Sequence, residues 1–299
     1  MTNPVKGPFR PGVVWAIVWL HIGALAGLVC AVWSCFTVGV SATVWVMALG
    51  LYVANFIGIS VGYHRLWTHQ AFKCRRWVQY TLAVLGGLAA EGPLAVPPEV
   101  QKRYRGWVKD HLQHHASTDR DYDPHSPRQW GFFWAHMGWL FFETVPPPGW
   151  RNTTRLDNDP VVRWQYRWYW YIAVAGFVVP GLVALAVGGW MAGLQGVLIA
   201  GFLRTVAHLH VTWCVNSVAH LWGTRATSSA GVPYTDDDSR NNWVLALFSG
   251  GEGWHGYHHA DPNSYQLGVK WWHFDPGKWF INILRWTRLA WDGRRFARS

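Results

Sequence analysis

Two histidine triplets with the same H-x-x-H-H spacing stand out in this sequence. They consist of His111, His114 and His115 and of His255, His258 and His259. In a helix, residues three and four positions apart share a face, so each triplet would direct its imidazoles to one side. Three cationic rings would repel one another there, whereas neutral rings can bind iron, zinc, copper or nickel. The repeated spacing therefore indicates metal binding.

Further histidines point to a second metal ion. His64 and His69 follow one apolar segment, and Asn216 and His220 lie four residues apart after another. Together with the triplets they make nine histidines. One ion takes roughly three to six ligands, so nine indicate two ions close together. For His64 and His69 alone, interfacial histidines without a metal role would be an equally good interpretation.

The other histidines lack this pattern. His125 follows Asp121, Asp123 and Pro124, and we expect it to orient or adjoin the metal site. The rest are expected to pack in the interior, at an interface or behind the ligands, and they are His21, His136, His208, His210 and His273.

Composition indicates that these residues are positioned by a membrane protein. Of the 299 residues, 51% are hydrophobic and only 14% are charged, against about 25% in soluble domains. Twenty-four tryptophans and eleven tyrosines suit aromatic belts at a bilayer surface. The four cysteines show no CxxC spacing, which excludes a zinc knuckle or a disulfide framework. The net charge of +10 reflects membrane topology, since no RNA-binding motif accompanies it. No nucleic-acid partner is therefore expected.

Apolar segments predict four transmembrane helices, which form two hairpins with short uncharged turns. The first is interpreted as an anchor and not as a cleaved signal peptide. Two further apolar stretches, 77–96 and 130–142, suit interfacial or half-buried helices better than spans. The predicted spans are about 13–36, 42–63, 168–187 and 194–214.

Basic residues cluster in the N-terminus, in 64–167 and in 215–299, and neither short turn contains one. The positive-inside rule then places both termini and all the histidine groups in the cytoplasm. We expect one domain over 1–299, an all-α integral membrane protein with four transmembrane helices in two hairpins. Its cytoplasmic helical cap, formed by 64–167 and 215–299, would carry the metal site. The membrane would be the inner membrane in a bacterium or the endoplasmic reticulum in a eukaryote.

Three motifs make the sequence similar to a known family. His64-Arg65-Leu66-Trp67-Thr68-His69, the 111–115 triplet and the 255–259 triplet resemble the histidine boxes of the membrane-bound fatty acyl desaturases, in the stearoyl-CoA delta-9 branch. Stretches 123–126, 131–136, 216–220 and 251–255 match as well, so the resemblance covers about 50–290. Gly256 departs from the family pattern, where many relatives have asparagine.

The resemblance implies a di-iron centre and a reaction with O2. Two external electrons and O2 would remove hydrogen from adjacent carbons of an acyl chain and leave a cis double bond, at delta-9 in this branch. Asp123, His125 and Glu252 would adjoin the ligands. The implied iron ligands are His64, His69, His111, His114, His115, His220, His255, His258 and His259, with Asn216 acting through a water.

The resemblance also implies a substrate tunnel. Trp107 and Thr212 match positions that shape its bend, and Lys109 and Asp110 match a pair that contacts the CoA head group. Arg103 and Arg105 could add phosphate contacts, although simple positive-inside charge explains these cations equally well. Tyr52 and Phe56 lie one turn apart in the second span. Phe56 replaces a small residue at the far end, and we expect it to favour acyl chains shorter than stearoyl.

Partners and competing functions remain open from the sequence. The chain has no dinucleotide fingerprint, no CxxC pair and no fused cytochrome b5 signature, so a separate donor is expected, a ferredoxin, rubredoxin or cytochrome b5 with its reductase. The acyl group could arrive as acyl-CoA, another thioester or an acyl lipid. Related di-iron oxidations (by a hydroxylase, an acetylenase or a terminal-alkene-forming decarboxylase) are the first alternative. A non-enzymatic membrane metal-binding or transport protein is a remote second.

Overall fold

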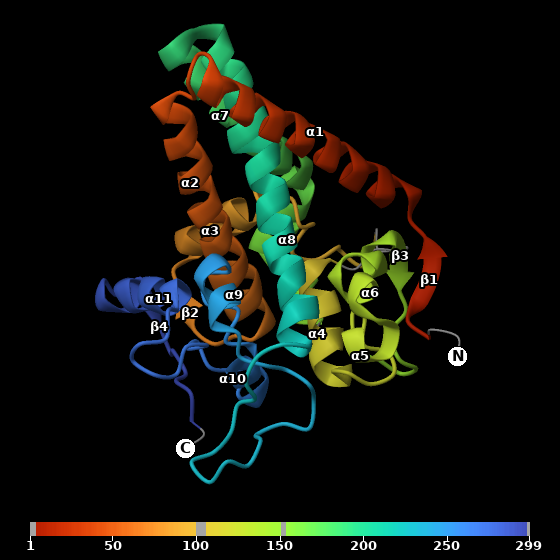
Figure 1. Cartoon of the computed structure of the whole chain (residues 1–299). Coiled ribbons are helices and arrows are strands. Elements are labelled where there is room, and N and C mark those ends of the chain that lie inside the picture. The colour runs from red at the N-terminus through yellow and green to blue at the C-terminus, as the bar shows by residue number, and fades with distance from the viewer. Residues whose placement is uncertain (1–3, 100–105, 151–153, 298–299) are drawn as a thin grey trace.

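Long apolar helices dominate one end of the protein. The computed structural model describes residues 4–99, 106–150 and 154–297 and is mostly helical (Figure 1). Among the described residues, three helical segments are long and apolar enough to cross a membrane: Pro11–Phe36, Ala42–Thr68 and Pro160–His220. Large apolar side chains point outward from them, including Trp15, Trp19 and Leu25, each more than 60% exposed. Such surfaces suit a lipid environment.

The three segments are built from several helix types. The first is α1 (Pro11–Phe36), and the second joins α2 (Ala42–Phe56) to the π-helix η1 (Ile57–Thr68). The third runs through α7 (Pro160–Gln195), the π-helix η4 (Gly196–Leu203), α8 (Arg204–Ser217) and the 3₁₀ turn η5 (Val218–His220).

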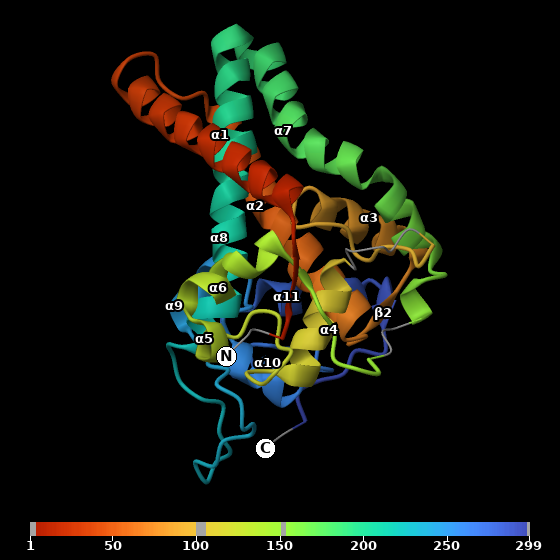
Figure 2. The ribbon, with the colours of Figure 1, turned by 90° about the vertical axis from the view of Figure 1, so that its right-hand side faces the viewer.

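Gly189 reverses the direction of the third segment. Its φ of 75° and ψ of −171° interrupt the helix, a conformation that is essentially restricted to glycine. Near the bend the two arms approach closely, because a Cβ on Gly196 would lie 2.6 Å from the carbonyl oxygen of Pro180. Figure 2 shows α7 leading to the bend and α8 returning from it. The bend falls between the third and fourth predicted spans, 168–187 and 194–214.

Short elements gather at the other end of the molecule (Figure 1). Neither predicted interfacial stretch forms a helix long enough to span a bilayer, since both give short helices. The helical elements of this end are α3 (Arg76–Gly87), α4 (Trp107–Ser117), α5 (Pro127–Trp130), α6 (Phe132–His136), η2 (Gly138–Phe141), η3 (Thr154–Leu156), α9 (Trp243–Phe248), α10 (His255–Ala260) and α11 (Pro276–Trp286).

Two small antiparallel pairings depart from the all-α prediction. The strand β1 (Lys6–Phe9) pairs with β3 (Phe142–Thr144), and β2 (Lys73–Cys74) pairs with β4 (Ala290–Trp291). Strands this short contain no alternating pattern that a sequence could reveal. They fasten both ends of the chain to the cap.

The main core lies beneath the histidine-bearing segments. Val61, Leu82, Val108, Tyr265 and Ile281 are almost fully buried and belong to one cluster. This cluster joins η1, α3, α4 and α11, so hydrophobic packing fixes η1 against α4. This packing holds together the two segments that contain or adjoin His64, His69 and the 111–115 triplet.

Candidate metal centre

The π-helical geometry of η1 brings the first two histidines together. His69 donates its backbone N–H to the carbonyl of His64 at 3.1 Å, a bond between residues five apart. A π-helix places such residues one above the other, and the two rings lie 4.8 Å apart between centroids. The H-x-x-x-x-H spacing is therefore the natural spacing for this helix type.

Five histidines form the first of two groups. The candidate ligand atoms of the five lie within 4.8 Å of one another. The Nε2 atom of His258 is 2.9 Å from that of His64 and 2.8 Å from that of His115. Metal–nitrogen bonds of about 2.1 Å place neighbouring ligands about 3 Å apart, so this spacing fits a shared ion. The group consists of His64, His69, His111, His115 and His258.

Four further histidines form the second group, again with ligand atoms within 4.8 Å. Their Nε2 atoms face one another, at 3.3 Å between His114 and His259 and 3.0 Å between His220 and His255. Within each triplet, the two histidines four residues apart belong to the same group. The third histidine belongs to the other group, so His258 joins the first group and His114 joins the second. Each triplet thus serves both groups, and all nine predicted histidines are brought together.

Carboxylates fix the orientation of four of these rings. The Nδ1 atom of His64 lies 2.7 Å from Glu252, and that of His114 lies 2.9 Å from Asp123. Sequence reasoning missed two equivalent pairs, His220 with Asp119 at 3.0 Å and His259 with Asp237 at 3.3 Å. A carboxylate that accepts the Nδ1–H leaves Nε2 free to bind a metal ion. The only sequence signal was an acidic run, 236–238, in a basic region.

The electrostatic environment favours the neutral form of five of these rings. Burial and the surrounding histidines hold the pKa values of His111, His114 and His115 well below the usual range, and those of His255 and His258 too. Neutral imidazole is the form that binds metals.

The pKa values of two nearby carboxyl groups, Asp119 and Asp123, shift in opposite directions. Burial tends to raise the pKa of Asp119, but the hydrogen bond and charge of His220 outweigh it and lower that pKa to about 2. Burial dominates at Asp123 and raises its pKa to about 7, against hydrogen bonds from the Asp119 and His125 backbones. The ring of His125 stacks on His114 at 4.3 Å between centroids.

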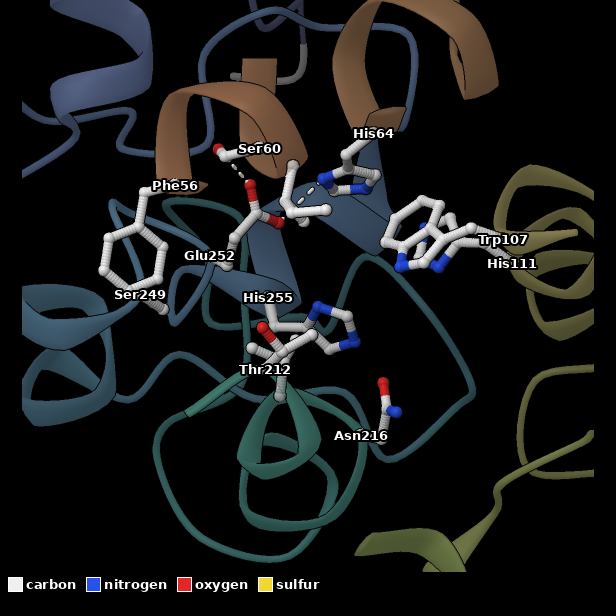
Figure 3. A pocket seen from close by; sticks show the side chains of 12 residues that line it. Phe56, Ser60, His64, Trp107, His111, Thr212, Asn216, Ser249, Glu252 and His255 are labelled. Atoms are coloured by element: carbon white, nitrogen blue, oxygen red, sulfur yellow. Dashed lines mark hydrogen bonds and ion pairs between the residues drawn. The ribbon is translucent and has the colours of Figure 1, made fainter. Parts of the chain in front are cut away.

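A cavity adjoins both groups through His64, His111 and His255 (Figure 3). Phe56 and Trp107 lie on opposite sides of it, and Thr212 and Asn216 line it from α8. The Trp107 ring stacks on His111 at 5.0 Å. The structure therefore places four predicted site residues around one cavity beside the candidate ligands.

These features agree with a family assignment. A family model described as "Fatty acid desaturase" matches residues 40–281. The chain belongs to the fatty acid desaturase family. It is 36% identical over 282 residues to a "Probable acyl-CoA desaturase" of Schizosaccharomyces pombe, covering 93% of this chain and 55% of that relative. The chain thus spans about half the length of that relative.

Two other relatives match this chain over most of both sequences. The "sn-1 stearoyl-lipid 9-desaturase" of Anabaena variabilis is 36% identical over 291 residues, which is 94% of each chain. "Stearoyl-CoA desaturase 5" of Homo sapiens is 33% identical over 309 residues, covering 97% of this chain and 85% of the relative.

Behind the cavity lies a carboxylate that sequence reasoning missed. Glu91, which is 4% exposed in its side chain, accepts hydrogen bonds from Trp107 Nε1 at 2.9 Å and Thr212 Oγ1 at 2.8 Å. Its Oε1 also lies 3.0 Å from His208 Nε2. One buried side chain therefore holds both predicted bend residues. No motif marked Glu91, because its partners are distant in the sequence.

The remaining predicted substrate residues are Tyr52, which contacts Phe56, the buried pair Lys109 and Asp110, and two arginines. The Tyr52 hydroxyl donates to the carbonyl of Phe248 at 3.1 Å, and its ring contacts Phe56 at 4.5 Å. Lys109 and Asp110 are 3% and 6% exposed, and the Lys109 ammonium lies 3.4 Å from Asp157. Their role at the head group stays a prediction. Arg103 and Arg105 lie outside the described residues.

Proposed function

We propose that this protein introduces a cis double bond into a fatty acyl chain at delta-9, using O2 and two external electrons. The observation that carries the proposal is the division of nine histidines, seven buried and two partly buried, into groups of five and four beside one cavity. The names of the relatives, which refer to acyl-CoA and stearoyl-lipid 9-desaturases, support the same reaction.

The donor set fits two iron ions. The first group of five would hold one ion, and the second group of four, with Asn216 through a water, would hold the other. Inward-facing Nε2 atoms and carboxylate-bound Nδ1 atoms are the arrangement that ligating histidines show. When bound, the irons would supply the O2-derived oxidant that removes two hydrogens from the chain.

The side chains around the cavity would position the acyl chain. Glu91 fixes the Trp107 indole and the Thr212 hydroxyl, so one wall of the cavity is rigid. A bend at this wall would hold two adjacent carbons next to the histidine groups, and such positioning lowers the barrier. Phe56 lies at the opposite side and would limit the chain length. Each buried methylene contributes about 0.8 kcal/mol to binding.

The same proposal includes the membrane arrangement. The bend at Gly189 lies within α7 and reverses the chain before η4 and α8, which supports two spans in the third apolar segment. Four spans in two hairpins would then carry the cap on the cytoplasmic side. The acyl substrate, as acyl-CoA or acyl lipid, would enter from the bilayer, and a separate ferredoxin, rubredoxin or cytochrome b5 would deliver electrons.

Lipid analysis of cells expressing the protein tests this function. Mass spectrometry should show a new monoene with its double bond at one position, and the product should vanish in the His114→Ala variant, because that ring belongs to the second group. A hydroxy acid or a terminal alkene in its place would contradict desaturation. The same amount of monoene from the His114→Ala variant would refute the role of the histidines.

A further inference from the structure

Helix α11 has two apolar faces. Gly277, Ile281 and Leu284 are buried against the core. On another face, Trp279, Ile283 and Trp286 form a stripe at positions i, i+4 and i+7, and they are 46%, 57% and 83% exposed. We call these three residues the α11 stripe. An exposed apolar stripe of this kind marks a surface that contacts something other than water.

The position of α11 identifies what the stripe contacts. Its first turn packs on Arg65 in η1, so closely that a Cβ on Gly277 would lie 2.8 Å from the guanidinium. The Asp275 carboxylate, which caps the helix, accepts a hydrogen bond from Arg65 at 2.8 Å. Because η1 ends the apolar segment Ala42–Thr68, α11 lies at the level where that segment ends. Figure 1 shows α11 running crosswise to α2.

Aromatic and basic side chains continue this surface beyond the stripe. The backbone N–H of Arg75 donates to Leu289 at 3.0 Å, which places the start of α3 beside the end of α11. Trp77 in α3 is 57% exposed, and Arg75 and Arg288 are exposed as well. The acidic Asp292 nearby is paired with Lys73 at 2.9 Å. Aromatic rings flanked by cations match the interface of a bilayer that contains anionic lipids.

We propose that α11 lies parallel to the membrane in the headgroup region, with its stripe facing the acyl chains and the flanking arginines facing lipid phosphates. This inference rests on the proposed function, because it requires that the apolar segments cross a bilayer. It adds a lipid-binding surface in the C-terminal part of the chain, apart from the spans and the metal centre.

The base of α11 links this surface to the metal centre. Arg65 lies between Asp275 and Glu252, at 2.8 Å and 3.7 Å, and Glu252 holds the Nδ1 atom of His64 at 2.7 Å. A helix fixed at the bilayer surface would therefore fix the height of His64 relative to the lipids. An acyl chain leaving the bilayer would meet the histidines at a constant depth.

A site-specific fluorescence experiment tests the placement. Cys30, Cys35, Cys74 and Cys214 are replaced with serine, and Ile283→Cys is labelled with an environment-sensitive dye in the full chain. The matched control is Val232→Cys, which is 61% exposed and so comparable with Ile283 at 57%, but lies between η5 and α9. Both are placed in nanodiscs containing phosphatidylglycerol and quencher-bearing lipids. Strong quenching at 283 but not at 232 is expected. No quenching at 283, or quenching at 283 equal to that at 232, would overturn the proposal.

A functional comparison covers the case in which the cysteine-free chain does not fold. With all native cysteines present, the double variant Ile283→Ser and Trp286→Ser should raise the KM for substrate presented in vesicles about tenfold, with kcat unchanged. Val232→Ser should leave both constants unchanged. An unchanged KM in the double variant, with monoene still formed, would overturn the membrane placement of α11 while the desaturase function stands.

Discussion

At the scale of single residues, carboxylates behind the histidines do as much to form the site as the histidines themselves. Glu252, Asp123, Asp119 and Asp237 each hold one Nδ1 atom. Without that contact a ring can rotate or change its tautomer, and Nε2 no longer faces the ion. The affinity for metal therefore depends on residues outside the histidine boxes.

Replacing Asp119 tests this dependence. Asp119→Asn removes the charge that holds His220, and loss of such a partner weakens metal binding by about 10- to 100-fold. Iron retained per chain after a chelator challenge is the measurement. Asp121→Asn, two residues away at an exposed position, is the control. Equal iron loss from both variants would show that Asp119 has no special role.

Glu91 defines a second prediction at this scale. Glu91→Ala would leave the Trp107 indole and the Thr212 hydroxyl without their shared acceptor. Unpaired buried donors cost about 1–3 kcal/mol each, so the wall of the cavity should loosen. We expect double bonds at several positions and roughly tenfold slower turnover, measured by mass spectrometry of the products. Glu99→Ala, at an exposed glutamate, should keep a single position, and an unchanged product from Glu91→Ala would contradict the prediction.

At the scale of secondary structure elements, helix type and helix ends decide which side chains meet. In the π-helix η1, residues five positions apart lie on the same face. Near its end, Arg65 packs against the first turn of α11. The neighbouring α2 ends at Phe56, which contacts Tyr52 at 4.5 Å and His208 at 4.6 Å between ring centroids. The end of α2 thereby closes one side of the cavity.

The Phe56→Ala variant tests whether this closure selects chain length. Removing the ring should extend the cavity and shift the preference towards acyl chains that are longer by two or more carbons. At about 0.8 kcal/mol per methylene, two carbons correspond to roughly a tenfold change in relative kcat/KM. Competition between acyl chains of different length is the measurement, and Val53→Ala, an exposed position of α2, is the control. An unchanged preference in Phe56→Ala would exclude a role in chain length.

At the scale of the whole molecule, sequence reasoning succeeded where the information was local. Apolar length predicted four spans, all of which fall within the three described segments that can cross a membrane, and triplet spacing predicted six of the histidines that gather. It could not predict Asp119, because its partner His220 lies 101 residues away. Glu91 and Thr212 are likewise 121 residues apart. One sequence contains no record of such tertiary contacts, nor does its periodicity distinguish a π-helix from an α-helix.

The net charge of +10 gives a prediction for the whole molecule. An acidic electron donor should be steered to a basic surface, and salt screens this attraction. Turnover with such a donor should fall several-fold as ionic strength rises from about 0.01 M to 1 M. Turnover supported by an uncharged chemical reductant should not change. Equal salt dependence with both reductants would contradict electrostatic docking.

Iron stoichiometry of the purified, active protein tests the central claim most directly. Two histidine groups predict two irons per chain, with activity proportional to the doubly loaded fraction as iron is restored to stripped protein. His69→Ala changes only the first group and His220→Ala only the second, so each variant should lose activity while keeping close to one iron. Full activity at one iron per chain, or in protein that contains no iron, would contradict the account.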